Sequence, residues 1–297
     1  MLSRAMERSI SIVGAGRVGR TLGKRLRGLG WHIGAVVTRS AATSRAAVCQ
    51  IGAGDPYSRL VPEILDSKVI LLTTPDGALG TVANTLASFG ESKLRDKIVV
   101  HTSGAMDRSV LAPLARRGAS TGSLHPMQTF SGRGAPNLEK VIFAVEGDRD
   151  AAAVARKIAR SLGGVPVAVS GKSKPAYHAA GLLAAGHGLG LMEAATQVLL
   201  KLGFSRQDAL RALLPLTRQM LDNFEKLGPR KSWTGPVSRG DFETVAKHTK
   251  AMQRYPREFQ EAYAALALLS NKVLSKKPAA ASNHLKRALK KPTGGKS

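Results

Sequence analysis

Three glycines near the start of the sequence have the spacing of a phosphate-binding turn. Gly14, Gly16 and Gly19 form a G-x-G-x-x-G pattern between a short apolar run and an amphipathic segment. In such a strand-to-helix turn the first glycine permits the bend, the second lets backbone N–H groups reach a pyrophosphate, and the third allows close helix–strand packing. The helix N-terminus adds partial positive charge. The pattern predicts a dinucleotide site that also includes Arg17 and Val18.

The end of the second expected strand carries a basic residue at a position that selects between cofactors. An acid near this point binds the ribose hydroxyls of NAD, whereas an arginine accommodates the 2′-phosphate of NADP. Residues 17–54 contain no Asp or Glu, and the strand ends in Thr38-Arg39-Ser40. Arg39, helped by the two hydroxyls, therefore favours NADP(H) over NAD(H). The alternative is that Arg39 is a solvated surface residue.

Three further loops follow expected strands and carry small or polar groups that suit chemistry. In open α/β sheets, ligands bind beyond the carboxyl ends of the strands. Thr74 and Pro75 lie in the first loop and are expected to border the cofactor, while Asp76 could simply cap the next helix. Ser103, in the second loop, could hydrogen-bond a substrate carboxylate or carbonyl. His125, in the third, could be a proton donor or a histidine that only fixes its turn.

A second histidine that could donate a proton begins the long apolar helix expected over residues 177–202. Lys174 and His178 are four residues apart, on one face of a helix. His178 and His187 are nine residues apart, about half a turn out of phase, so they do not form a metal pair on a straight helix. We expect no metal site, and a packing role for His187. Ser103, His125 and His178 are the expected catalytic residues.

The elements that must position these residues alternate between strand and helix. That alternation predicts an α/β fold whose N-terminal, Rossmann-type, mostly parallel sheet is followed by an all-α domain. The expected strands cover residues 10–13, 33–38, 69–73, 98–101, 120–124, 141–145 and 165–169. The expected domains are a cofactor-binding domain over residues 1–170, a helical domain over 171–275 for substrate binding and dimerisation, and a disordered basic tail over 276–297.

Composition narrows the class of protein further. The 297 residues are 43% hydrophobic and 22% charged, as in globular proteins, but the net charge is +25. The only cysteine, Cys49, is expected to be a buried apolar residue in a reducing, cytoplasmic setting. We expect no signal peptide or membrane span. Basic charge favours a small anionic substrate. Nucleic acid is not the expected partner, because the tail has no aromatic residues to stack on bases.

Several motifs resemble, in their order, a bacterial family of Rossmann-like proteins with a C-terminal domain of unknown function. They are Gly14-Ala15-Gly16-Arg17-Val18-Gly19, His101-Thr102-Ser103-Gly104-Ala105, Leu124-His125-Pro126, Tyr177-His178-Ala179-Ala180 and Thr234-Gly235-Pro236-Val237-Ser238-Arg239-Gly240-Asp241. The family is similar to pyrroline-5-carboxylate reductase, ketopantoate reductase, and the β-hydroxyacid and 6-phosphogluconate dehydrogenases. The resemblance implies NADP(H)-dependent hydride transfer to or from a small C=O or C=N substrate, and a homodimer formed by the helical half.

Two departures from the family pattern leave an alternative open. Family members usually carry an Asn where this chain has Gly186. The helix lysine of the β-hydroxyacid dehydrogenases has no clear counterpart, since Leu182 stands at about that position. The alternative function is therefore a non-catalytic NADP(H)-binding sensor or regulatory protein.

Overall fold

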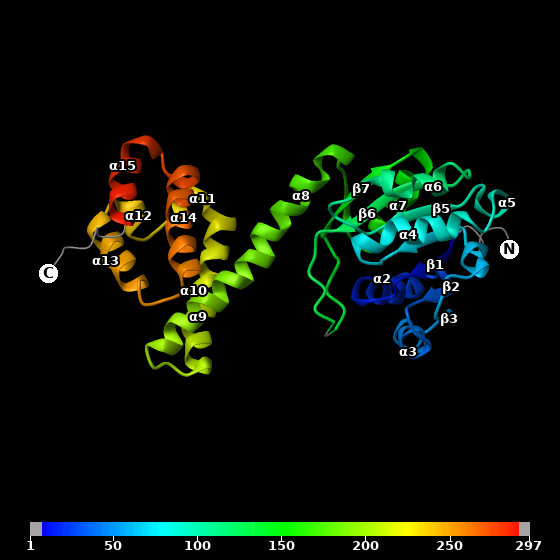
Figure 1. Ribbon diagram of the computed structural model, residues 1–297, viewed down its shortest axis with the longest axis horizontal. Coiled ribbons are helices and arrows are strands. Elements are labelled where there is room, and N and C mark those ends of the chain that lie inside the picture. The colour runs from blue at the N-terminus through cyan, green and yellow to red at the C-terminus, as the bar shows by residue number, and fades with distance from the viewer. Residues whose placement is uncertain (1–7, 133, 291–297) are drawn as a thin grey trace. The chain divides into compact units, whose positions relative to one another are not determined.

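The computed structural model describes residues 8–132 and 134–290 (Figure 1). The chain divides into two compact units, residues 1–186 and 187–297. The boundary lies within the long helical segment rather than at residue 170, because α8 (Lys174–Gly181) belongs to the first unit.

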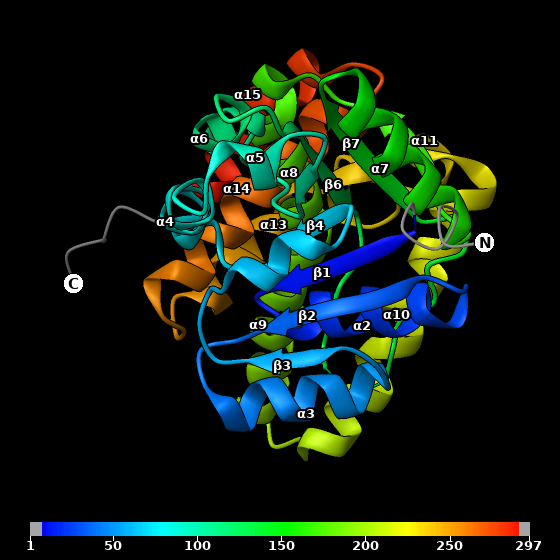
Figure 2. The same ribbon diagram turned by 90° about the vertical axis from the view of Figure 1, so that its right-hand side faces the viewer.

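The first unit is built on one sheet of eight described strands. Their order across the sheet is β3-β2-β1-β4-β5-β6-β7-β8, and neighbouring strands are parallel except for the antiparallel pair β6 and β7. Figure 2 shows β3, β2, β1 and β4 side by side in that order. The strands are β1 (Ser9–Val13), β2 (His32–Val37), β3 (Asp55–Tyr57), β4 (Val69–Leu72), β5 (Ile98–His101), β6 (Ser120–Pro126), β7 (Ile142–Gly147) and β8 (Val165–Ala168). The mostly parallel Rossmann-type sheet is thus confirmed.

Helices cover both faces of this sheet, and each face has its own apolar core. One core joins β1 to α2, α3 and α7, and the other joins β4 to α4 and α6. Central strands are buried on both sides, as β1 and β4 are at every residue, which explains their continuous apolar runs. The helices of this unit are α2 (Arg17–Gly28), α3 (Ala41–Ile51), α4 (Asp76–Ala87), α5 (Glu91–Leu94), α6 (Ala112–Ala115), α7 (Arg149–Ser161) and α8, with 3-10 helices at Pro62–Asp66, Arg108–Leu111 and Gly171–Ser173.

Two expectations about this unit are wrong. Cys49 is exposed rather than buried, because the buried stripe of α3 runs through Ser44, Ala47 and Ile51, and Cys49 falls on another face of that helix. His125 does not lie in a loop. It is the sixth residue of β6 and pairs across the sheet with Ala144.

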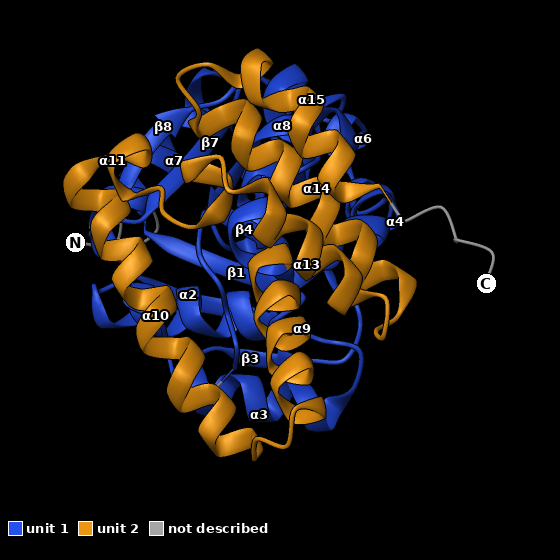
Figure 3. Ribbon diagram, turned by 90° about the vertical axis from the view of Figure 1, so that its left-hand side faces the viewer, with its two compact units in different colours: residues 1–186 blue, residues 187–297 orange. Residues whose placement is uncertain are grey.

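The second unit is helical, as predicted (Figure 3). A π-helical turn, Leu182–Gly186, precedes it, so the segment expected as one straight helix changes its winding before His187. Asp241 caps its helix as expected, since its side chain accepts from Thr244 N at 3.1 Å. The helices are α9 (His187–Lys201), α10 (Arg206–Leu227), α11 (Pro229–Ser232), α12 (Pro236–Arg239), α13 (Phe242–Met252), α14 (Arg257–Leu274) and α15 (Pro278–Leu289).

The expectation of a disordered tail from residue 276 onward is wrong for the part that the structure describes. Residues 278–289 form α15, and its Leu285 is fully buried in a small core with Val245 and Ala267. Residues 291–297 lie outside the described residues. No helix in the described ranges is long and apolar enough to cross a membrane.

Candidate active site

The glycine turn after β1 has the geometry that its spacing predicts. Gly14 has a φ of 82°, and a Cβ there would lie 2.7 Å from Thr74 N, so both the bend and the packing require glycine. A Cβ on Gly16 would meet only Gly14 O, at 3.7 Å, which leaves the backbone open to a ligand. A Cβ on Gly19 would collide with Thr73 Oγ1, so this residue allows α2 to pack against the sheet.

The helix that follows this turn begins without a side-chain cap. Gly16 occupies the N-cap position of α2, and the first turn carries no acidic residue. The helices α4, α14 and α15 also lack a side-chain cap, whereas Ser40, Asp148, Ser205 and Asp241 cap α3, α7, α10 and α13. The first N–H groups of α2 and the positive end of its dipole are therefore available to an anion.

Arg39 lies next to the glycine turn. The N–H groups of Gly14 and Ala15 donate to Val37 O at 2.9 and 3.1 Å, which fastens the turn to the end of β2. Arg39 is exposed and has no hydrogen bond or ion pair to any described residue. The neighbouring hydroxyls are engaged locally, because Ser40 Oγ caps α3 and Thr38 Oγ1 lies 2.6 Å from Thr43 Oγ1. The guanidinium is thus the group that remains available here.

The other predicted cofactor residues lie in this turn or in the loop beside it: Arg17, Val18, Thr74 and Pro75. The Arg17 guanidinium is exposed and reaches Phe130 O at 3.4 Å, a long bond that a better acceptor could replace. Val18 packs its side chain against the apolar core that joins β1 to α2, α3 and α7. Thr74 carries a buried Oγ1 with no hydrogen-bond partner among the described residues, and Pro75 is the N-cap residue of α4. An orphaned buried hydroxyl is the kind of group that a bound ligand satisfies.

Ser103 connects the loop after β5 to the loop after β4. Its Oγ donates to Asp76 Oδ2 at 2.9 Å and accepts from Ala105 N and Met106 N at 3.2 and 3.0 Å. The Asp76 carboxylate therefore accepts the hydrogen bond of Ser103 and does not cap α4. The N-cap residue of α4 is Pro75, which makes no capping hydrogen bond. A hydroxyl has one proton and two lone pairs, so a substrate would have to displace one of these partners. The substrate-positioning role of Ser103 stays a prediction.

His125 and His178 converge on the backbone of Gly104. Their ring centroids are 5.7 Å apart, nearly perpendicular, and a Cβ on Gly104 would lie 2.7 Å from His125 Nε2 and would also collide with the His178 ring. His125 is half-buried, while His178 is exposed. The structure therefore brings two of the predicted catalytic residues together, and only glycine fits between them.

The hydroxyl of Tyr177 orients the His125 ring. The sequence analysis does not predict this role for Tyr177. His125 Nδ1 lies 3.1 Å from Tyr177 Oη, and the phenolic oxygen also has a hydrogen bond from the Ala144 backbone. When Tyr177 donates its proton to Nδ1, the proton of the neutral ring is on Nε2, beside Gly104. Burial, and next the charge of Lys174, lower the pKa of His125 to about 4, so the ring is neutral near pH 7.

A fully buried lysine supports this arrangement from within. Lys174 is 0% exposed, and its Nζ donates to Ser103 O and to Ser123 Oγ, both at 2.9 Å. Burial lowers the pKa of Lys174 to about 8, although the carboxylates of Glu146 and Asp107 act in the opposite direction. The sequence analysis places Lys174 on the face of His178 and gives it no role, and full burial of a lysine is rare.

His101 completes the buried part of the site. Its Nδ1 accepts from Ser103 N, so its proton lies on Nε2, which is 3.2 Å from Asp107 O. Burial, followed by the charge of Lys174, lowers the pKa of His101 to about 4. His101 is therefore a neutral residue that fixes the start of the Ser103 turn.

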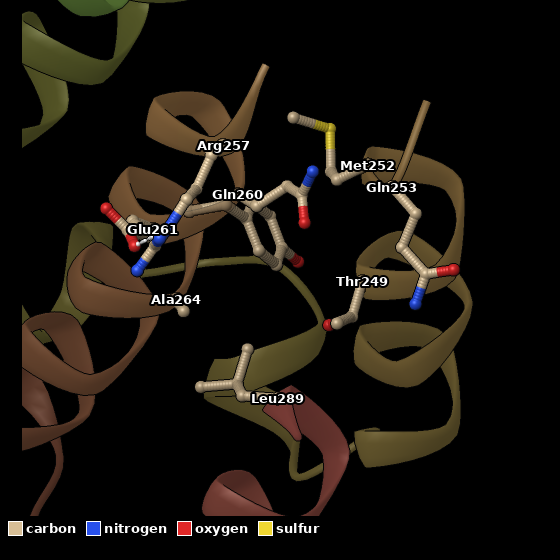
Figure 4. A pocket seen from close by; sticks show the side chains of 9 residues that line it. Thr249, Met252, Gln253, Arg257, Gln260, Glu261, Ala264 and Leu289 are labelled. Atoms are coloured by element: carbon tan, nitrogen blue, oxygen red, sulfur yellow. Dashed lines mark hydrogen bonds and ion pairs between the residues drawn. The ribbon is translucent and has the colours of Figure 1, made fainter. Parts of the chain in front are cut away.

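The helical unit holds a pocket of about 260 Å³ that contains none of the predicted site residues (Figure 4). Several of its polar groups are already paired. Arg257 is bonded to Glu261 at 2.6 Å, and Tyr263 Oη lies 2.9 Å from His248 Nδ1. The described residues also include no group of three His, Cys, Asp or Glu side chains that could hold a metal ion. The predicted site residues therefore lie in the first unit and not around this pocket.

Comparison with known families identifies both parts of the chain. Residues 3–126 match the model of a Rossmann-like domain, and residues 141–269 match that of a domain of unknown function, DUF2520. This combination confirms the family resemblance that the motifs indicate. No functionally curated protein sequence matches the chain significantly.

Solved structures similar to this chain share its fold over most of its length. BF3122, a proposed NADP oxidoreductase from Bacteroides fragilis, is 21% identical with a TM-score of 0.73, covering 89% of this chain and 97% of that one. TM1727 from Thermotoga maritima is 24% identical with a TM-score of 0.66 over the same shares. A reductive aminase from Aspergillus terreus, solved with NADPH and ethyl-5-oxohexanoate, is 18% identical with a TM-score of 0.57, covering 98% and 96%.

Proposed function

We propose that this chain, which joins a Rossmann-like domain to a DUF2520 domain, is an NADP(H)-dependent oxidoreductase that transfers hydride to or from a small, anionic C=O or C=N substrate. The comparisons give the fold, and the proposed NADP oxidoreductase and the reductive aminase among the similar structures support the cofactor class. The residues of this chain supply the rest of the argument.

The observation that carries the proposal is a continuous line of connected loops along the sheet edge. Hydrogen bonds join the glycine turn to the end of β2, next to Arg39. Gly14 packs against Thr74, and Asp76 then accepts from Ser103 in the next loop. The adjoining Gly104 contacts His125 and His178. This order suits a 2′-phosphate at Arg39, a pyrophosphate at the glycine turn and a proton donor at the histidines, which is the order that NADP(H) and its substrate require.

The residues present fit the cofactor. The open backbone at Gly16 and the uncapped start of α2 would hold the pyrophosphate, with Arg17 beside it. Arg39 would hold the 2′-phosphate, and the orphaned hydroxyl of Thr74 would gain a partner. When bound, the cofactor supplies or accepts the hydride, and the protein orients the substrate and handles the proton.

His125 and His178 take different parts in that proton step. Hydride addition to a C=O or C=N group leaves negative charge, or a lone pair, on the oxygen or nitrogen. The neutral His125 ring stabilises that atom by donating a hydrogen bond from Nε2. His178, which is exposed, donates the proton and recovers it from solvent. Lys174, fully buried, does not reach the substrate.

A titration followed by a substrate panel tests the proposal. The purified protein is titrated with NADPH and with NADH, and NADPH oxidation is then measured with keto acids and cyclic imines. The double variant H125N/H178N should retain NADPH affinity but lose at least about a hundredfold in turnover. H32N, which changes an exposed histidine outside the site, is the control. Absence of binding to both nucleotides refutes the proposal, and unchanged turnover removes both histidines from it.

A non-catalytic NADP(H) sensor is the second candidate. It is favoured by the complete engagement of the Ser103 hydroxyl, which leaves this residue no free group for a substrate. A sensor would bind NADPH and show no oxidation across the whole panel.

We further propose that the chain forms a homodimer through its helical unit. On α10, Leu216, Met220, Phe224 and Leu227 recur at helical spacing and are 68%, 47%, 54% and 51% exposed. An exposed apolar stripe of this kind marks a protein interface. Light scattering after size exclusion should give the mass of a dimer, and F224D should give that of a monomer. A monomeric wild-type protein would refute this assembly.

A further inference from the structure

A chain of hydrogen bonds leads from the buried end of Lys174 toward the surface. Lys174 Nζ donates to Ser123 Oγ at 2.9 Å, and Ser123 Oγ donates to Glu146 Oε2 at 3.4 Å. Ser123 and Glu146 face each other across β6 and β7. Glu146, with a side chain 13% exposed, also accepts from Arg108 N at 2.9 Å. The half-exposed Arg108 guanidinium lies 3.8 Å from the same carboxylate. The buried ammonium is thus linked to a carboxylate near the surface.

The other end of this chain is fixed to the active site. Lys174 Nζ donates to Ser103 O at 2.9 Å, and Ser103 is the residue before Gly104. Gly104 in turn contacts the rings of His125 and His178. An ammonium that loses its proton loses one donor and its charge, so its hold on the Ser103 carbonyl weakens. The charge on Lys174 therefore determines how firmly this turn is held.

Among the charged groups that act on Lys174, Glu146 is linked to the ammonium by two hydrogen bonds, with Ser123 as the one residue between them. A buried ammonium without a compensating carboxylate is costly, and the usual result is loss of the proton. Titratable or charged groups come from every element around the lysine: His101 on β5, Asp76 on α4, Asp107 before the 3-10 helix Arg108–Leu111, His125 on β6, Glu146 on β7, and His178 on α8. Glu146 has the strongest favourable effect on the protonated lysine.

We propose that Glu146 is a positioning residue that, through Ser123, keeps the Lys174 ammonium charged and thereby holds the Ser103–Gly104 turn against His125 and His178. The catalytic consequence of this inference rests on the proposed function. Opposite pKa changes support it, since burial lowers the pKa of Lys174 and raises that of Glu146, and each group partly counteracts the change in the other.

Lysine-detected NMR on the full-length protein tests the inference without a substrate. Protein labelled with ε-¹³C-lysine is titrated between pH 6 and 11, and the Lys174 signal is assigned by its loss in K174R. E146Q keeps the shape of the side chain and removes its charge, so the Lys174 pKa should fall by at least about one unit. D150N removes one exposed carboxylate on α7 that has no part in this chain and should leave the pKa unchanged.

A second measurement separates positioning from folding. The NMR signals of the His125 and His178 rings should change over the same pH range in which Lys174 titrates. This change should occur at a lower pH in E146Q than in the wild type. E146D should bring it part of the way back to the wild-type pH. NADPH affinity should be equal in both proteins. If E146Q binds NADPH and its Lys174 pKa is unchanged, the positioning role of Glu146 is refuted and the proposed function is not. Absence of NADPH binding in the wild type refutes the proposed function and, with it, the catalytic consequence, even where the titration still shifts.

Discussion

The Tyr177 hydroxyl lies 3.1 Å from Nδ1 of His125, although 52 residues separate them in the sequence. This contact joins the start of α8 to the end of β6, within the first unit. With the tyrosine as the donor, this contact selects the tautomer that presents the Nε2 proton at Gly104. A tyrosine that sequence analysis treats as part of a family motif is thus the residue that orients a predicted catalytic histidine.

Replacing that tyrosine should weaken catalysis without affecting the cofactor. Y177F removes the hydroxyl that fixes the His125 tautomer, so turnover should fall by about tenfold, and NADPH affinity should stay the same. Y263F is a matched control, because Tyr263 makes a similar bond, 2.9 Å to His248 Nδ1, in the helical unit. Steady-state kinetics and a fluorescence titration measure both quantities. Equal turnover in Y177F and wild type would show that the tautomer of His125 does not matter.

Buried neutral histidines should make the first unit sensitive to acid. The pKa values of His101 and His125 are about 4, below the ordinary value of 6.5, so between these limits the unfolded chain binds protons that the folded chain does not. Stability therefore decreases as the pH falls from about 6.5 toward 4. For the fully buried His101 the loss is on the order of 2–3 kcal/mol.

Urea denaturation at several pH values from 7.5 to 4.5 checks this expectation. The unfolding free energy of the wild type should fall steadily below pH 6.5. H101Q, which lacks the titrating ring, should be less stable at pH 7.5 but should lose less on acidification. A wild-type stability that is flat or rises in this range would show that the histidines titrate normally.

Sequence analysis predicts the sheet well because local patterns specify most of its strands. The buried runs at β1 and β4 and the glycine turn are continuous in sequence, and the structure places them as expected. Strand β3 is missed, because Asp55-Pro56-Tyr57 follows two glycines and has the pattern of a loop that ends a helix. These residues form a strand only through their pairing with β2. An edge position in a sheet is also where proline is tolerated.

The connections within the site are not predictable in the same way. Lys174 and Ser103 are 71 residues apart, and nothing in the local pattern shows that a lysine four residues before a histidine will be fully buried. The Asp76–Ser103 bond spans 27 residues and replaces the helix cap that local reasoning allows for the aspartate. Sequence thus indicates which loops meet at the carboxyl edge, and the tertiary structure determines which side chains bond there.

Arg39 should select NADPH over NADH. R39S removes the only described charge at the end of β2, so the dissociation constant for NADPH should rise at least about tenfold while that for NADH changes little. R45S is the control, since Arg45 is exposed on the adjoining α3 and has no described partner. Titrations of both variants with both nucleotides measure the change. Equal preference in R39S and wild type would assign Arg39 to the solvated surface.

Substitutions of the first two glycines of the turn should affect NADPH binding and folding stability differently. G16A places a Cβ where only Gly14 O lies within 4 Å, so the fold should tolerate it within about 0.5 kcal/mol. The added methyl group lies in the approach of a pyrophosphate, so NADPH affinity should fall at least about tenfold. G14A forces a φ of 82° on alanine and a clash with Thr74, so it should lose both affinity and about 1–3 kcal/mol of stability. Thermal unfolding with and without NADPH distinguishes the two, and normal NADPH affinity in G16A would refute the pyrophosphate site.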